Sequence, residues 1–314
     1  MELKELKEKI AAAGVVGAGG AGFPTAVKLA SGADTLLINA SECEPLIHTD
    51  FYLLKYHLPT LLEGAETILK AAGIKQAIFG VKEHNARRLK WTQGEKLSEN
   101  VSVHILPNSY PIGDEVILTY QVLKRIIKPG KLPISEGVIV MNAESVYNVC
   151  HAVRDGSAVT EKWLTVAGKV NNPVVLKVPV GTPVKDLLAQ LGETVPEGYV
   201  VVDGGPAMGT IIDPDKAVVK KTTKGILILS KDIPAIAEKM TTSRIVNVKA
   251  NSNCCQCTFC TDMCPRALLG YPLKPHRIVR VSMSEVEANP KLFADAQLCS
   301  ECGICELAAC CQGP

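Results

Sequence analysis

The stretch Gly17-Ala18-Gly19-Gly20-Ala21-Gly22-Phe23-Pro24-Thr25, with Lys28 three residues further on, decides how the N-terminal half is interpreted. Its glycines fit the G-x-G-x-x-G spacing of dinucleotide-binding loops, and Glu42 follows twenty residues after the last of them. That motif requires a strand directly before it, whereas residues 2–13 carry apolar side chains at helical spacing. The loop alone therefore fits two interpretations equally, a phosphate-binding loop and a tight turn that ends a helix.

Composition describes a globular chain rather than a disordered one. The 314 residues are 47% apolar and 21% charged, and the net charge is +2. This length predicts two or three domains, and the balanced charge argues against nucleic acid or an anionic membrane as the main partner. The sequence has no apolar run long enough for a membrane span and opens with no signal peptide, so the expected compartment is the cytoplasm.

Strand and helix patterns alternate over residues 1–158. The expected strands are 35–40, 76–81, 101–106 and 137–141, and the expected helices are 51–72, 85–97 and 115–126. Such alternation predicts βαβ units and a parallel, Rossmann-like sheet. Ligands bind at the carboxyl ends of such strands, which is where Asn39, Glu42 and Asn142 would emerge.

Residues 159–232 have a different pattern, with two strands, a helix and further short strands. This order resembles a β-grasp module, with strands at 163–170, 174–178, 199–202, 217–220 and 226–229 and a helix at 184–191. Nothing in the module indicates acid–base chemistry, so a structural or docking role is expected. A linker is expected at 233–250, followed by a cysteine-rich domain at 251–314.

The twelve cysteines are unevenly distributed, since ten of them lie in the last 61 residues. In a chain without a secretion signal this favours a metal or cluster domain over a disulfide scaffold. One run has the C-x2-C-x2-C-x3-C-P spacing of two-cluster ferredoxins, in which the fourth cysteine of each run ligates the other cluster. Zinc, the alternative, usually takes pairs of cysteines.

Two [4Fe–4S] clusters are therefore expected. Their ligand sets are Cys254, Cys257, Cys260 and Cys310 for one cluster, and Cys299, Cys302, Cys305 and Cys264 for the other. The second run has four residues before its last cysteine, so Cys310 and Cys311 both remain candidates, with Cys310 preferred. Cys255 is expected to be a spare thiol.

Four further motifs accompany the glycine loop. They are Asn39-Ala40-Ser41-Glu42-Cys43-Glu44-Pro45, Tyr110-Pro111-Ile112-Gly113-Asp114-Glu115, Asn142-Ala143-Glu144 and Gly204-Gly205-Pro206-Ala207-Met208-Gly209. Together they resemble the NADH-oxidising flavoprotein subunit of respiratory complex I and, more closely, the Rnf-C-type subunit of the Rnf complex and its relatives. The resemblance covers nearly the whole chain in order. The cysteine spacing further resembles soluble members such as PduS-type cobalamin reductases, or the Rnf-C-like proteins that supply proline reductase.

The resemblance implies a multidomain α/β fold: a Rossmann-like FMN domain with a parallel sheet, a β-grasp domain of the SLBB type, and a C-terminal two-cluster ferredoxin-like α-helical domain. It implies FMN and two [4Fe–4S] clusters as cofactors and NADH as substrate. The implied FMN-binding residues are Gly17, Gly19, Gly20, Gly22, Lys28, Asn39, Glu42, Gly113 and Asn142. The implied NADH-side residues are Phe23, Glu44, Tyr110 and Glu115. Ser41 departs from the aspartate of complex I.

The function expected from this resemblance is electron transfer from NADH through FMN and the clusters to a partner protein, with cobalamin or an amino-acid reductase as acceptor. The alternative is an adaptor that binds no NADH and receives electrons from another flavoprotein, as an Rnf-C-type subunit would. A microcompartment or a membrane complex remains open as its place, and so do a homo-oligomer and membership of a larger complex as its state. Since the soluble relatives continue past the second cysteine run, the chain is expected to be a truncated form.

Simpler interpretations stand beside these for three positions. Lys28 could be a surface lysine, although its neighbours favour phosphate binding. Glu42 could be a solvated loop acid, although a position at the ligand edge of a sheet favours function. Glu115 could simply begin a helix, because acidic residues favour helix N-termini.

Overall fold

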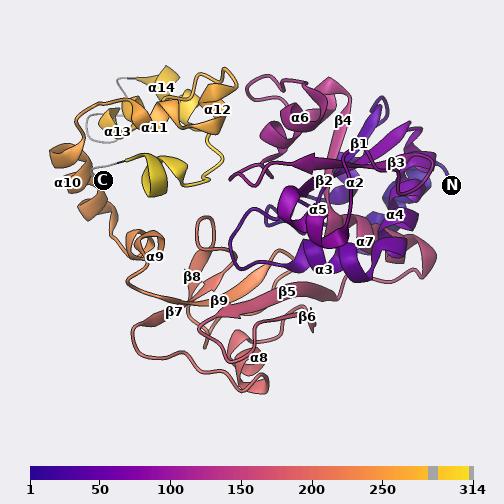
Figure 1. The fold of residues 1–314 in the computed structure, drawn as a ribbon, viewed down its shortest axis with the longest axis horizontal. Coiled ribbons are helices and arrows are strands. Elements are labelled where there is room, and N and C mark those ends of the chain that lie inside the picture. Colours follow the sequence, from indigo (N-terminus) through magenta and orange to yellow (C-terminus); the bar gives the residue numbers. More distant parts are fainter. Residues whose placement is uncertain (282–288, 311–314) are drawn as a thin grey trace.

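The computed structural model describes residues 1–281 and 289–310, which form three parts that follow one another along the chain (Figure 1). The N-terminal part consists of α1 (Leu3–Ala12), α2 (Thr25–Lys28), β1 (Thr35–Asn39), α3 (Thr49–Tyr56), α4 (Leu58–Ala72), β2 (Gln76–Lys82), α5 (Glu83–Leu89), β3 (Val101–Leu106), α6 (Glu115–Leu123), the 3-10 helix η1 (Pro133–Glu136), β4 (Val138–Asn142) and α7 (Ala143–Arg154).

The four strands of this part form one parallel sheet in the order β3-β2-β1-β4, which confirms the predicted α/β class. Because side chains alternate along a strand, β1 contributes to two cores. Leu36 and Ile38 pack with α1, α4 and α7, whereas Leu37 packs with α6 on the opposite face. Asn39 and Asn142 lie opposite each other at the ends of adjacent strands, so two of the predicted site residues meet at one sheet edge.

Two predicted helices of this part are shorter than the pattern suggested. The helix expected at 51–72 is two helices, α3 and α4, because Pro59 lies in the first turn of α4. In a continuous helix its ring would clash with the carbonyl four residues earlier. The helix expected at 85–97 ends at Leu89, since Lys90 adopts the left-handed conformation.

The middle part contains β5 (Glu161–Gly168), β6 (Val174–Pro179), α8 (Val184–Gln190), β7 (Tyr199–Asp203), β8 (Thr210–Ile212) and β9 (Gly225–Ser230). Its mixed sheet has the order β6-β5-β9-β7-β8, with β5 and β9 parallel and the other pairs antiparallel. The strand expected at 217–220 is reduced to an isolated bridge between Val218 and Pro183. The three-residue strand β8 was not predicted, because it is too short to show alternation.

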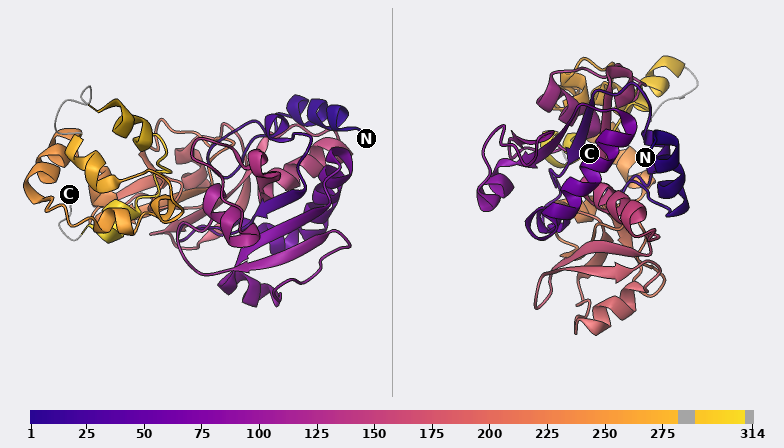
Figure 2. Two further views of the ribbon diagram at one scale, coloured as in Figure 1. Left: turned by 90° about the horizontal axis from the view of Figure 1, so that it is seen from above. Right: turned by 90° about the vertical axis from the view of Figure 1, so that its right-hand side faces the viewer.

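The C-terminal part is helical. It contains α9 (Pro234–Lys239), α10 (Ser243–Asn253), α11 (Phe259–Asp262), α12 (Pro265–Leu268), α13 (Pro275–Val281), α14 (Pro290–Ala296) and the π-helical turn η3 (Cys305–Ala309). The segment expected as a linker therefore holds α9 and most of α10. This part and the parallel-sheet part lie at opposite ends of an elongated molecule (Figure 2). No helix among the described residues is both long and apolar enough to cross a membrane.

Candidate functional site

The glycine loop forms a closed turn at the carboxyl end of β4. The Gly17 amide donates to the Phe23 carbonyl over 2.8 Å, and the Gly22 amide donates to the Gly17 carbonyl over 3.1 Å. Gly20 and Gly22 have φ values of 118° and 66°, which strongly favour glycine. The Ala18 amide donates to Ser145 Oγ over 3.0 Å, so the turn is fixed to the first turn of α7.

Three predicted ligand-binding side chains lie together beside this turn. Lys28 Nζ lies 3.4 Å from the Val140 carbonyl, 3.9 Å from Glu115 Oε2 and 5.8 Å from the centroid of the Phe23 ring. The Phe23 side chain is 38% exposed, which leaves its ring accessible to a ligand. The lysine thus lies between the glycine loop and the N-terminus of α6, as a phosphate-binding role requires.

Asn39 and Gly113 interact with each other. Asn39 Nδ2 donates to the Gly113 carbonyl over 2.8 Å, while Asn39 Oδ1 accepts from Ser41 Oγ over 2.6 Å. The Gly113 amide donates to Cys43 Sγ over 3.0 Å, and a Cβ at Gly113 would lie 2.6 Å from Ser41 Oγ. The structure therefore places Gly113 as a close-packing glycine that joins the loop before α6 to the end of β1.

Asn142 lies at the centre of the sheet edge. Its Oδ1 accepts the Glu144 amide and caps α7, while its Nδ2 donates to the Asn39 carbonyl over 3.3 Å and to Asp50 Oδ2 over 3.2 Å. A Cβ built on Gly19 would lie 3.6 Å from Asn142 Cβ, so the glycine loop rests on this residue. Asn142 thus connects the loop with the buried Asp50.

Glu42 binds the N-terminus of α3. Oε1 accepts from the Thr49 hydroxyl and the Asp50 amide, and Oε2 accepts from the Phe51 amide. Burial, followed by the neighbouring Asp50 carboxylate, raises the pKa of Glu42 to about 7, although Lys224 opposes the shift. Every hydrogen bond that Glu42 makes in the structure therefore stabilises a helix, and its role toward a ligand stays a prediction.

Replacing Glu42 with glutamine is expected to change how stability depends on pH. The folded protein holds the Glu42 proton more tightly than the unfolded chain, so the contribution of this group to the free energy of unfolding is complete below pH 4.5 and is lost as the pH rises through about 7. Urea unfolding at several pH values should show a shallower decline between about pH 5 and pH 7 in Glu42→Gln than in the wild type. Glu8→Gln, on the exposed face of α1, is the control. An unchanged slope in Glu42→Gln would contradict this assignment.

Glu44 reaches the β-grasp part rather than the sheet edge. Its Oε2 accepts the Ala207 amide over 2.9 Å and its Oε1 accepts the Met208 amide over 2.6 Å. A Cβ on Gly205 would collide with the Glu44 carboxylate, so this glycine allows the 204–209 loop to close around the acid. Glu44 therefore docks one domain on another in the structure.

Tyr110 connects the parallel-sheet part with the C-terminal part. Its hydroxyl donates to the Cys302 carbonyl over 2.6 Å, and burial raises the pKa of this phenol above its usual range. Nearby, Arg266 donates to Asp114 Oδ2 over 2.7 Å and to the Leu298 carbonyl, and Asp114 also caps α6. These two contacts hold the second cysteine run against the loop that precedes α6.

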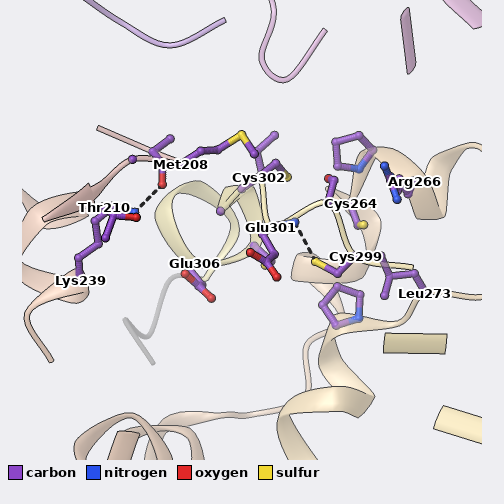
Figure 3. A pocket seen from close by; sticks show the side chains of 18 of the residues that line it. Met208, Thr210, Lys239, Cys264, Arg266, Leu273, Cys299, Glu301, Cys302 and Glu306 are labelled. Atoms are coloured by element: carbon purple, nitrogen blue, oxygen red, sulfur yellow. Dashed lines mark hydrogen bonds between the residues drawn. The ribbon is translucent and has the colours of Figure 1, made fainter. Parts of the chain in front are cut away.

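All four cysteines of one predicted cluster line a single cavity of about 580 Å³. Figure 3 shows Cys264, Cys299 and Cys302 on this cavity, and Cys305 completes the set. The Glu301 amide donates to Cys299 Sγ over 3.3 Å, the kind of contact that tunes the potential of a cluster. No three His, Cys, Asp or Glu side chains in the described ranges converge tightly enough for a single metal ion, so what the four thiols share is a cavity.

The other predicted cysteine set lies further from the parallel sheet. Helix α11, which contains Cys260, packs against η3, and Cys310 directly follows that turn. Gln256 Nε2 donates to Cys254 Sγ over 3.0 Å and to the His276 carbonyl. The structure thus brings Cys310 toward the first run, whereas Cys311 lies outside the described residues.

Two groups of residues at these sites were missed by the sequence reasoning. Lys82 is only 6% exposed and ends β2, so it brings a buried positive charge to the sheet edge beside Cys43. A lysine that closes an otherwise apolar strand was its signal. The second group, Lys221 and Lys224, belongs to the β-grasp part and carries no pattern that could reveal its partners.

The residues fit the expected groups. A Cβ on Gly20 would meet nothing within 4 Å, so the backbone at the tip of the loop is approachable, and Lys28 supplies a cation beside it. At the cysteine cavity, Arg266 Nε is buried without a hydrogen-bond partner in the described part of the chain. A buried guanidinium beside four thiolates suits a cluster of net negative charge.

Family comparisons agree with this division. The Nuo51 FMN-binding domain matches residues 10–151, the SLBB domain matches 164–210 and the 4Fe-4S dicluster domain matches 253–313. These matches and the fold define a class of oxidoreductase-related proteins with flavin-binding and iron–sulfur electron-transfer domains. They confirm the predicted three-part fold class.

Comparison with whole proteins identifies the family. The chain is 40% identical over 309 residues to the cobalamin reductase PduS of Citrobacter freundii, which covers 98% of the chain and 68% of that protein. It is 29% identical to the Rnf-C-type component of the Na⁺-translocating ferredoxin:NAD⁺ oxidoreductase complex of Acetobacterium woodii, over 84% of the chain and 58% of that component. The chain belongs to this PduS and Rnf-C-type family, as the sequence motifs predicted.

The same fold occurs in a solved structure. A chain of an NAD⁺-reducing [NiFe]-hydrogenase in the H2-reduced state superimposes with a TM-score of 0.64 and 20% identity, over 98% of this chain and 59% of that one. This likeness shows the shared fold.

Proposed function

We propose that the protein oxidises NADH and delivers single electrons through two [4Fe–4S] clusters to a partner, with cobalamin or an amino-acid reductase as acceptor. The observation that carries the proposal is the 2.6 Å hydrogen bond between Tyr110 and the Cys302 carbonyl, which joins the flavin-binding part to the cysteine cavity. Bound FMN would convert a two-electron donor into single electrons. Unpaired cysteines suit a reducing compartment, so we assign the protein to the cytoplasm.

Each part of the chain has its own task in this proposal. The glycine loop and Lys28 bind the FMN phosphate, and Asn142 supports the loop from below. Phe23 offers its exposed ring to the nicotinamide, with Glu115 on the same side. The cavity cysteines hold the cluster nearer the flavin, and the set around Cys254 holds the one nearer the partner.

An anaerobic titration with NADH tests the proposal. Addition of NADH to the purified protein should bleach the flavin absorbance and then reduce the clusters. Dithionite provides the reference for full reduction. If NADH leaves the flavin oxidised while dithionite still reduces the clusters, NADH is not the donor and the adaptor function replaces this proposal.

Replacing Tyr110 with phenylalanine is expected to slow reduction of the clusters about threefold to tenfold, because a net hydrogen bond is worth about 1 kcal/mol and holds Cys302 against the flavin-binding part. Stopped-flow absorbance after mixing with NADH measures the rate, and the iron content should not change. Tyr120→Phe is the matched control, since its hydroxyl makes no hydrogen bond within the described residues. Equal rates in both variants would contradict a role for the Tyr110 hydroxyl.

A further inference from the structure

A four-residue segment of the β-grasp part, Lys221–Lys224, lies against the flavin-binding part immediately before β9. Its shape is fixed from within its own domain, because Thr223 Oγ1 accepts the Lys220 amide over 3.1 Å and donates to Asp203 Oδ2 over 3.2 Å. With Thr223 held in this way, the side chains on either side of it are presented to the neighbouring part.

The first half of this segment holds both ends of the glycine loop. Lys221 Nζ donates to the Gly14 carbonyl over 2.7 Å, just before the loop begins. Thr222 Cγ2 lies 3.1 Å from the place a Cβ would take on Gly22, where the loop ends. Any larger residue at Gly22 would press on Thr222, so loop and segment are packed together.

The second half reaches the residues beneath the loop. Lys224 Nζ donates to Thr49 Oγ1 over 3.0 Å and forms an ion pair with Asp50, and the two side chains are only 14% and 3% exposed. Asp50 in turn accepts from Asn142 Nδ2, and Asn142 supports the loop at Gly19. A continuous chain of contacts therefore runs from Lys224 to the underside of the glycine loop.

Charge explains why a lysine stands at this place. Glu42 and Asp50 lie close together at the N-terminus of α3, and Lys224 is the cation that directly contacts Asp50. Without it, Asp50 would be a buried carboxylate that has only Asn142 and Thr49 nearby as neutral neighbours. The Asn142 amide would then be drawn toward an uncompensated charge.

We propose that Lys221 and Lys224 are positioning residues of the flavin site. Through Gly14 and through Asp50 and Asn142, they set the shape of the glycine loop before a ligand binds. The β-grasp part is thus a third wall of the site and not merely a docking module. This inference rests on the proposed binding of FMN by the glycine loop.

The test is the affinity of the flavin-free protein for FMN, followed by the quenching of FMN fluorescence. We expect Lys224→Met to weaken FMN binding at least tenfold and Lys221→Met to weaken it severalfold. Lys224→Arg should recover most of the affinity, because it preserves the ion pair with Asp50. The control is Lys220→Met in the same turn, whose 61% exposed side chain pairs only with Asp203 of its own domain.

Hydrogen exchange provides a second readout that needs no ligand. In the flavin-free protein, amides at 17–22 should exchange roughly tenfold faster in Lys221→Met than in Lys220→Met. This variant also keeps the inference testable if Lys224→Met does not fold. If the wild type binds FMN while Lys221→Met and Lys224→Met bind it as tightly as Lys220→Met, the inference is wrong and the proposed function stands. If the wild type binds no FMN, the proposed function fails, and the inference fails with it.

Discussion

Replacing Cys302 with serine is expected to remove about half of the iron, roughly four of eight atoms, because one of the two proposed [4Fe–4S] clusters loses a ligand. Cys302 lines the cavity together with the other three cysteines of its predicted set. A serine hydroxyl is a poor ligand for iron in a cluster, since the soft thiolate is the donor that these clusters require. The contact with Tyr110 uses the backbone carbonyl of Cys302, so the substitution leaves that link between the domains in place.

Iron and acid-labile sulfide measured after anaerobic reconstitution provide the readout. Cys257→Ser, in the first run, should remove a similar amount of iron, and the two substitutions combined should remove nearly all of it. Cys255→Ser is the matched control, since Cys255 is an exposed cysteine next to the first run that belongs to neither predicted set. Full iron content in Cys302→Ser, or loss of all iron from this single substitution, would contradict the proposed division into two independent sets.

The parallel sheet could be predicted because its information is local. Each strand is a short apolar run, and each fits the alternation of a βαβ unit. The cysteine runs are equally local, since ligands of one cluster that share a loop must keep a fixed spacing. Pro59 shows that even the misjudged helix contained its own signal, because a proline inside a helical pattern marks a boundary.

The partners of the site residues could not be predicted in the same way. Glu44 follows a predicted strand just as Glu42 does, and nothing in the sequence distinguishes them. In the structure Glu42 binds a helix only a few residues away, whereas Glu44 binds backbone amides more than 160 residues further along the chain. Which acid meets which donor depends on how two domains dock, and no local pattern records that.

The lysines of the β-grasp part make the same point. A lysine within an apolar strand, such as Lys162 in β5, indicates only that the ammonium group must find a partner or remain at the surface. The sequence analysis assigned this module no charged role, because the carboxylates that face its lysines belong to the preceding domain. These interdomain pairs are the part of the site that only the three-dimensional structure reveals.

Replacing Lys162 with methionine is expected to destabilise the protein by about 3–5 kcal/mol, because it leaves a buried carboxylate without its counter-ion. Lys162 Nζ forms an ion pair with Glu144, and each side chain is only 1% exposed. Burial lowers the pKa of Lys162, and the facing Glu144 carboxylate opposes that shift. Glu144 also accepts the Trp163 amide over 3.0 Å, so it cannot turn away from the interface without breaking a second bond.

Urea unfolding followed by tryptophan fluorescence measures the loss, since Trp163 lies beside the pair. The double variant Glu144→Gln with Lys162→Met should recover most of the lost stability, because glutamine carries no charge and its carbonyl oxygen still accepts the Trp163 amide. Lys177→Met is the matched control on the adjacent strand β6, where the pair with Glu161 is exposed and should be worth less than about 1 kcal/mol. A Lys162→Met variant as stable as Lys177→Met would mean that the Glu144 carboxylate is protonated or hydrated at this interface, and the pair would then contribute nothing to docking of the β-grasp part.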